Sequence, residues 1–152
     1  KIVEDSWAFT ATWLQTVWND WSGCWLRVKT DAAYINLEHN ALVVIDHKTG
    51  KYREEKNAEY LEQLELYGVA GLVQMPTIDV VSPRLWYLDQ GVVYPNPDEE
   101  EIEYFRKDEK LLRKKWEMKV KPMMTDTTFK PTPGAACQWC HYRKSNNGPC
   151  KF

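Results

Sequence analysis

The chain contains one stretch, Ala41-Leu42-Val43-Val44-Ile45-Asp46-His47-Lys48-Thr49-Gly50-Lys51, in which an apolar run ends in charged residues and a glycine. The uninterrupted, β-branched half is typical of a buried central strand, and the glycine marks the turn that follows. Asp46 and Lys48 are two residues apart, so in a strand their side chains point to the same face. The pattern therefore predicts a strand over 41–48 whose end holds a carboxylate beside an ammonium group.

A second strand-like segment precedes this one, over 25–37, and residues 38–40 are predicted to turn the chain back. If the two strands pair as a hairpin, Asp31 lies close to Asp46 and Lys48. Two carboxylates and a lysine can hold a divalent cation and orient a water for attack on a phosphodiester. The alternative is that Asp-x-Lys-Thr-Gly is a chance group of polar residues entering a turn.

The segment 56–74 is predicted to form a helix in which Gln63 and Tyr67, four residues apart, share one face. Gly68 and Gly71 would let this helix approach the sheet closely, at some loss of helix propensity. Without further context, Gln63 is more often a solvated polar residue and Tyr67 a core aromatic. The context here is the order Asp31, Asp46-x-Lys48, Gln63-x-x-x-Tyr67 at short spacings.

That order resembles the PD-(D/E)XK nuclease superfamily, in particular its RecB-like branch. The resemblance implies a mixed α/β fold with a restriction-endonuclease-like core, a central mixed sheet flanked by helices. It also implies a metal-dependent DNA exonuclease in which Asp31, Asp46 and the backbone carbonyl of His47 bind Mg²⁺ or Mn²⁺. Lys48 would orient the attacking water. Gln63 and Tyr67 would hold the lysine or the DNA backbone in place.

The relatives that this resemblance suggests are phage and prophage-type exonucleases of recombination and DNA processing. It therefore implies DNA as substrate, a single-strand annealing protein as a partner, and a cytoplasmic location. Val28 stands where the family often has a glycine, three residues before Asp31. A family helix that usually precedes this region is expected to be missing from the chain.

Three cysteines near the end of the chain, Cys137-x2-Cys140-x9-Cys150, have a spacing typical of metal sites. They resemble the cysteine cluster of iron–sulfur exonucleases, which implies a 4Fe–4S cluster whose fourth ligand lies upstream or is Cys24. His141 offers zinc as an alternative, although it directly follows Cys140. Two disulfides or a redox-active Cys-x-x-Cys are further readings, with no secretion signal or thioredoxin-like pattern to favour them.

Length and composition predict one domain over 1–152, with a loop-rich tail over 131–152 that a metal would staple. Hydrophobic residues make up 43% of the chain, and no run of 18 apolar residues predicts a membrane span. The net charge of −2 is not that of a generic nucleic-acid binder. Lys29, Lys51 and Arg53 are nevertheless candidate DNA-binding residues around the site, with a merely solvated face as the alternative.

The remaining segments complete the predicted sheet and add a second helix. Strands are expected over 7–14, 77–88 and 92–94, with Pro83 marking a break or an edge. A helix is predicted to start at Asp98, which is a good N-cap followed by three glutamates. Its apolar stripe consists of Ile102, Phe105, Leu112, Trp116 and Val120.

Two other classes of function stay open on sequence alone. One is a catalytically inactive nuclease-fold module that binds DNA or a partner and uses its cysteine site for stability. The other is a small zinc-stapled interaction domain in which the Asp-x-Lys match is accidental. The complete set of Asp31, Asp46, Lys48, Gln63 and Tyr67 argues against both. It does not separate an exonuclease from an endonuclease, and it does not give the oligomeric state.

Overall fold

The structure is a computed structural model that describes residues 2–151, with side chains from residue 5 onward. It divides into two compact units, 1–119 and 120–152. The strands are β1 (Ile2–Thr10), β2 (Cys24–Asn36), β3 (Ala41–Lys48), β4 (Val80–Tyr87), β5 (Val92–Tyr94) and β6 (Tyr104–Phe105). The helices are α1 (Asn57–Gln74) and α2 (Glu109–Thr125), with short 3₁₀ turns at Glu54–Lys56, Arg106–Asp108, Ala135–Trp139 and Lys144–Asn146.

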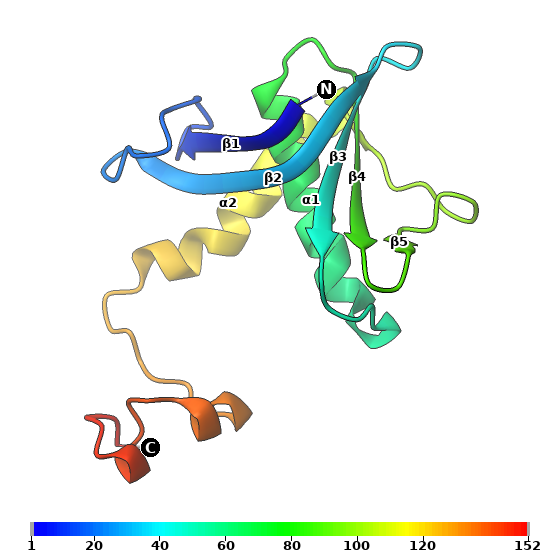
Figure 1. The fold of residues 1–152 in the computed structure, drawn as a ribbon. Helices are drawn as coiled ribbons and strands as arrows, with labels where there is room; N and C mark the ends of the chain where they lie inside the picture. The colour runs from blue at the N-terminus through cyan, green and yellow to red at the C-terminus, as the bar shows by residue number, and fades with distance from the viewer. Residues whose placement is uncertain (1, 152) are drawn as a thin grey trace. The chain divides into compact units, whose positions relative to one another are not determined.

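The strands of the first unit form one mixed sheet in the order β1-β2-β3-β4-β5, with β6 paired to β4 beside β5. Only β3 and β4 are parallel, and α1 is the crossover that connects them (Figure 1). Parallel neighbours need such a crossover, whereas β1, β2 and β3 follow one another through turns and pair antiparallel. The predicted mixed α/β fold with a central mixed sheet and flanking helices is confirmed.

The core lies where α1 packs on β3 and β4. The first six residues of β3 are all buried, as expected of a central strand covered on both faces. From Gly68 to Val73, α1 is buried at every position. A side chain at Gly68 would collide with the ring of Tyr104, and a Cβ at Gly71 would lie 3.1 Å from Leu42 and Val81. The two glycines therefore permit the close approach that the sequence predicted.

The pairing between β2 and β3 is short. It runs from Asn36 opposite Ala41 to Ala32 opposite Ile45, whereas β2 continues to pair with β1 as far as Cys24. The β1–β2 ribbon consequently turns away from β3 and β4, and the sheet opens into a fork (Figure 1). This fork begins at Asp31 on one strand and Asp46 on the other.

The predicted start of the second helix, at Asp98, is wrong. Residues 99–103 are irregular and α2 begins at Glu109, so Ile102 and Phe105 lie outside the helix. Leu112 and Trp116 do pack against the core, as the stripe predicted. The short strand β6 takes the place of the missing turns because it pairs with Val80 and Val81 of β4, a partner distant in sequence.

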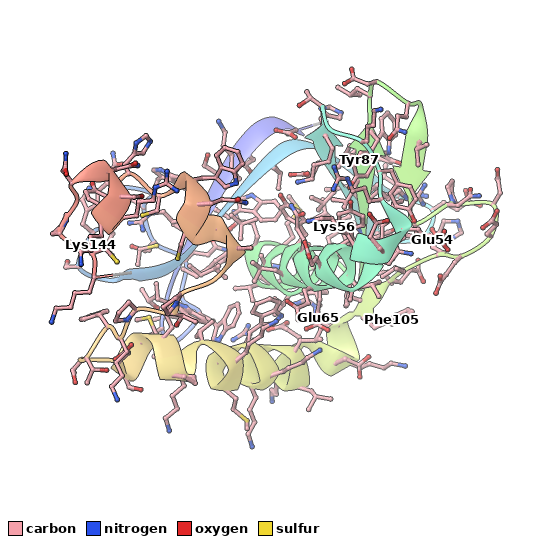
Figure 2. The ribbon with its side chains drawn as sticks, turned by 90° about the horizontal axis from the view of Figure 1, so that it is seen from below. Glu54, Lys56, Glu65, Tyr87, Phe105 and Lys144 are labelled. Carbon is pink, nitrogen blue, oxygen red and sulfur yellow. The ribbon has the colours of Figure 1, made fainter. Side chains whose placement is uncertain are left out.

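Arg106 explains why the chain does not become helical earlier. Its guanidinium donates hydrogen bonds to the carbonyl oxygens of Leu72 at 2.7 Å, Met75 at 2.6 Å and Ile78 at 2.7 Å. These carbonyls end α1 or follow it, where no amide within the helix can satisfy them. The arginine thus satisfies the carbonyls at the end of α1 and fixes the start of α2 beside it. Glu65, on the side of α1 that faces α2, forms an ion pair with Lys115 at 2.7 Å (Figure 2).

Two other strand predictions differ in detail from the structure. The strand expected over 7–14 is β1 and ends at Thr10, because the chain then turns through Trp13 at a positive φ of 64°. Pro83 lies inside β4, between the part paired with β6 and the part paired with β5. At that point β4 has no outer neighbour, so the predicted edge character of the proline is confirmed locally.

The second unit differs from the first in its burial and in its secondary structure. None of its described residues is buried, and its regular structure beyond the end of α2 is two 3₁₀ turns. Cys137, Cys140 and Cys150 are among the few positions that are partly buried. The sequence prediction of one domain with a tail from residue 131 stays a prediction. No helix within residues 2–151 is both long and apolar enough to cross a membrane.

Candidate active site

The fork between β2 and β3 is held by a side chain from one strand and the backbone of the other. The Asp31 Oδ2 atom accepts a hydrogen bond from the His47 backbone N–H at 2.6 Å. This amide lies just beyond the last paired residues, where β3 has lost the backbone partner that β2 provides further along. Asp31 therefore takes over the role of that partner and is fixed beside the end of β3.

Asp46 and Lys48 form an ion pair at the end of β3. The Lys48 Nζ atom lies 2.6 Å from the Asp46 Oδ2 atom. That oxygen is fully buried, and within residues 5–151 no group gives it a well-aligned hydrogen bond, so its contact with the ammonium is an ion pair. The buried negative charge of Asp46 is thus balanced by the positive charge of Lys48.

Helix α1 supplies the other two predicted side chains. The Tyr67 hydroxyl donates to the Asp46 Oδ1 atom at 2.6 Å, and the Gln63 side-chain amide donates to the Tyr67 oxygen at 3.4 Å. Burial raises the pKa of Tyr67, and the hydrogen bond to Asp46 raises it further. Tyr67 consequently keeps its proton at neutral pH and acts as a donor to the carboxylate.

The five side chains named from the sequence are thus linked through contacts at one place. Asp46 is the centre, because Lys48 and Tyr67 both touch its carboxylate and Gln63 touches Tyr67. Asp31 joins them through the His47 amide. The sequence spacing correctly anticipated this convergence, while the catalytic roles of the residues stay predictions.

The donor atoms suit a small, hard cation. Within the described residues there is no ready-made group of three or more His, Cys, Asp or Glu side chains that would hold a metal. Mg²⁺ and Mn²⁺ do not require one, since sites of this kind use one or two carboxylates, a carbonyl oxygen and several waters. Asp31, Asp46 and the His47 carbonyl fit this pattern, because they supply two carboxylates and a carbonyl oxygen at one end of β3.

The imidazole of His47 belongs to another environment. Its ring lies 6.1 Å from that of Trp86 on the neighbouring strand, at an angle of 53°. Side chains alternate along a strand, so the ring of His47 projects opposite to its neighbours Asp46 and Lys48. The side chain is therefore peripheral to the carboxylates.

The basic residues expected to bind DNA are more dispersed. Lys29 is exposed on β2, two residues before Asp31, and Lys51 and Arg53 are exposed in the segment after β3. The structure gives these three side chains no contact with one another within the region it describes. These residues are close to the site residues in sequence, and their role in DNA binding stays a prediction.

A cluster of four tyrosines beside the site escaped the sequence analysis. Tyr52, Tyr60, Tyr87 and Tyr94 contact one another with ring centroids 5.5–5.9 Å apart. Tyr87 lies opposite Lys48 in the β3–β4 register and is drawn with Lys56 and Glu54 in Figure 2. Burial raises the pKa of Tyr87, and a hydrogen bond with Tyr60 raises it further. The cluster packs with Leu64 and Leu85 beyond the end of β3, and its wide spacing in sequence gave no signal.

The cysteines are all free thiols, so the two-disulfide reading is wrong. In the second unit the Cys137 sulfur accepts a hydrogen bond from the Gly134 N–H at 3.3 Å, and the Cys150 N–H donates to the Tyr142 carbonyl at 2.9 Å. Cys24 belongs to the first unit, where its thiol donates to the Leu26 carbonyl at 3.2 Å. Among residues 2–151 these cysteines form no metal-binding group with His141 or with each other.

The fold and the site together define a class of protein, a mixed α/β domain with two carboxylates and a lysine at a fork in its sheet. A family model described as the PD-(D/E)XK nuclease superfamily matches residues 4–145. The chain therefore belongs to the PD-(D/E)XK nuclease superfamily, and its sheet is the expected restriction-endonuclease-like core. Comparison with curated proteins and with solved structures gave no match.

Proposed function

We propose that this protein is a metal-dependent deoxyribonuclease that hydrolyses phosphodiester bonds at the fork between β2 and β3. One observation carries the proposal: the Asp46 carboxylate is shared between Lys48 and Tyr67, while Asp31 is fixed beside it. Superfamily membership supports the same reaction class. Geometry and family together therefore support this assignment of the core of the site.

Asp31, Asp46 and the backbone carbonyl of His47 would hold Mg²⁺ or Mn²⁺. When bound, such an ion polarises the phosphate and lowers the pKa of a coordinated water. Asp31 contributes from a fixed position, because its other contact is to the backbone of β3. Asp46 is held by the donated hydrogen bond of Tyr67, which orients its carboxylate without moving a proton.

Lys48 would orient the attacking water and offset the negative charge that develops on the phosphate. Preorganised charges of this kind are the largest contribution in many active sites. The ammonium is already positioned by Asp46 at 2.6 Å, and its side chain is 30% exposed, so it can reach a substrate. Gln63 is positioned by its hydrogen bond to the Tyr67 hydroxyl. It would act as a positioning residue for that hydroxyl or for the DNA backbone.

Lys29, Lys51 and Arg53 would bind the phosphates of the DNA on either side of the scissile bond. Phosphate contacts by lysine and arginine supply most non-specific affinity and are weakened by salt. The three residues are exposed and flank the site in the chain. These three cations would compensate for the net charge of −2.

The finer assignments rest on the resemblance to RecB-like nucleases. They are exonuclease rather than endonuclease action, a role in phage or prophage recombination and DNA processing, a cytoplasmic location, and an annealing protein as partner. The site chemistry by itself serves either cleavage mode.

For the second unit we propose a structural metal site built on Cys137, Cys140 and Cys150. Its support is that these free thiols are partly buried in a unit whose described residues form no apolar core. The fourth ligand would be Cys24, His141 or a group upstream of the chain. A 4Fe–4S cluster follows from the family resemblance, and zinc is the alternative. Iron, sulfide and zinc content of protein purified without oxygen distinguishes them, and protein free of all three would contradict the site.

The proposed nuclease activity is tested with end-labelled linear DNA and closed circular DNA, in Mn²⁺ or EDTA. We expect Mn²⁺-dependent loss of linear DNA only, reduced on the order of 10³-fold or more in Lys48→Ala. Lys56→Ala is a matched control, because Lys56 makes only a surface ion pair with Glu59. Equal loss of circular DNA would make the protein an endonuclease. DNA binding without cleavage under any condition would overturn the enzyme in favour of an inactive binding module.

A further inference from the structure

The loop between β1 and β2, residues 11–23, presents an aromatic side chain to solvent. Trp21 is 80% exposed, and the Arg27 guanidinium lies over its ring at 4.6 Å from the centroid. The same guanidinium lies 6.0 Å from the ring of Trp18, which is also exposed. Because Arg27 covers one face of the Trp21 ring, the other face is open.

Two other tryptophans of this region show what packing alone requires. Trp13 is almost fully buried and donates its indole N–H to Glu117 at 2.8 Å. Trp25 packs edge-on against Trp13 at 5.2 Å and joins the core. Trp18 and Trp21 contribute to neither contact. Their exposure therefore needs an explanation other than stability of the sheet.

The loop is rigidly built around Asp20 and Arg27. The Asp20 carboxylate accepts hydrogen bonds from the Gly23 N–H and the Thr16 hydroxyl, each at 2.8 Å. The Gly23 hydrogen bond is the main reason why the pKa of Asp20 is lowered. Arg27 donates to the Trp18 carbonyl at 2.9 Å and to the Asp20 carbonyl at 3.2 Å. The two indoles are thus presented on a hydrogen-bonded loop, whose Asp20 carboxylate binds groups of the loop itself.

The aromatic pair lies in line with the proposed active site. Arg27, Lys29 and Asp31 occupy alternate positions of β2, while Val28 and Thr30 between them are buried. Alternate residues project from the same side of a strand. Each residue advances the strand by about 3.3 Å, so Arg27 lies roughly 13 Å before Asp31, four residues away. Among residues 5–151, no carboxylate pairs with Arg27 or Lys29. A strip of two cations therefore connects Trp21 to the fork.

We propose that Trp18, Trp21 and Arg27 form a stacking platform for the unpaired bases of a DNA single strand that leads into the active site. The platform rests on the proposed nuclease function and adds the substrate form that the site prefers. Trp21 would stack on a base with its open face, and Arg27 and Lys29 would contact the phosphates that follow. Aromatic stacking beside a positive groove is the general mode of single-strand binding.

Charge and ring chemistry favour this occupant over a duplex or a protein. Bases in a duplex are already stacked on each other and do not offer their faces to a side chain. A protein partner that buries apolar surface would use Leu14 and Val17 of the same loop, which are also exposed. The cations beside Trp21 instead match a chain of phosphates.

The test is fluorescence anisotropy with a labelled oligothymidylate and a labelled duplex, in a Lys48→Ala background that keeps the DNA intact. We expect Trp21→Ala to weaken single-strand binding by about 5- to 150-fold, the range for loss of one stacked base. Duplex binding should change less than about twofold, since no base is stacked there. Trp21 is exposed, so circular dichroism should show an unchanged fold.

Two controls decide whether stacking at this position is the cause. Leu14→Ala removes an exposed apolar side chain of the same loop, and Trp139→Ala removes an exposed indole of the second unit. Both should bind the single strand as the parent does. An unchanged affinity in Trp21→Ala, or an equal loss in Leu14→Ala, would overturn the platform. A change of oligomeric mass in Trp21→Ala with unchanged DNA affinity would instead make the loop a protein contact.

Failure of the platform and failure of the nuclease are distinguishable. Single-strand binding that depends on Trp21, in a protein that never cleaves DNA in Mn²⁺, would retain the platform and reject the enzyme. Cleavage that depends on Lys48, with Trp21→Ala binding and cutting single strands like the parent, would retain the enzyme and reject the platform.

Discussion

Residues 1–119 and 120–152 are stabilised by different kinds of interaction. The first unit buries large apolar side chains between a sheet and α1, with Leu42, Leu72 and Val81 completely inaccessible. In the second unit no described residue is buried, and Trp139 and Tyr142 are exposed. The cysteines are among its few partly buried side chains. The first unit can therefore fold by the hydrophobic effect, whereas the second requires another source of stability.

That difference has a physical basis in size. A segment below about 40 residues exposes too much surface to bury a sufficient core, and metals or disulfides usually replace it. Cys137, Cys140 and Cys150 are free thiols, and the metal proposed for them would take the place of an apolar core. The position of the catalytic candidates follows the same division, because Asp31, Asp46 and the residues around them all lie in the unit with a core.

The largest expected effect tests the metal proposed for the second unit and separates the two units. In Cys140→Ser, or after chelation, the second unit should lose its structure, since metal binding supplies on the order of 10 kcal/mol to small sites. Hydrogen exchange would show amides of 127–151 becoming unprotected while those of β3 and α1 stay protected. Equal protection with and without metal would mean that the second unit folds without it. Ser145→Ala, in the same unit, is the control.

The next effect concerns the core of the first unit. Leu72→Ala should lower the free energy of unfolding of this unit by about 2–5 kcal/mol, because Leu72 is completely buried against the sheet. Urea unfolding followed by circular dichroism measures the change. Leu61→Ala on the same helix is the matched control, because Leu61 is 40% exposed. Similar losses in both variants would contradict the assignment of the core to the Gly68–Val73 part of α1.

A smaller effect is expected for Tyr67→Phe, which leaves a buried oxygen of Asp46 without its donor. A hydrogen bond to a charged group contributes about 1.5–3 kcal/mol, and the free energy of unfolding should fall by that order. Urea titration of the variant and parent at neutral pH measures it.

The same variant has a signature in alkaline solution. The pKa of Tyr67 is raised in the folded protein above its ordinary value of 10.0, so above about pH 10 the unfolded chain loses this proton first. The stabilisation present below pH 10 is therefore lost as the pH rises. The parent should lose stability more steeply than Tyr67→Phe above pH 10. Parallel curves for the two proteins would mean that Tyr67 is not shielded by its site.

The first unit also shows which features a sequence can predict. The bounds of β3 and most of α1 were predicted because their apolar patterns are local. The convergence of Asp31, Asp46 and Lys48 followed from a hairpin, again a local relation. The start of α2 was missed because it depends on the pairing of Tyr104 with β4 and on Arg106 binding the end of α1.

The features near the site that escaped prediction also depend on contacts that the local sequence pattern does not encode. The tyrosine cluster joins four separate elements, and the contact of Arg27 with Trp21 depends on how the β1–β2 loop turns. Neither leaves a spacing pattern in the sequence. The second unit could be recognised only by its cysteines, and the sequence did not say which fourth group accompanies them.

The smallest expected effect tests whether surface charge contributes to the first unit at all. Lys115 pairs with Glu65 between α2 and α1, at 2.7 Å, but its side chain is 61% exposed. Exposed ion pairs contribute about 0–1 kcal/mol, because water and salt screen the charges. Lys115→Ala should therefore change the free energy of unfolding by less than 1 kcal/mol, and by less still in concentrated salt. A loss as large as that of Leu72→Ala would show that α2 is held to α1 by charge rather than by Leu112 and Trp116, and that the first unit is less dependent on its core than the comparison with the second implies.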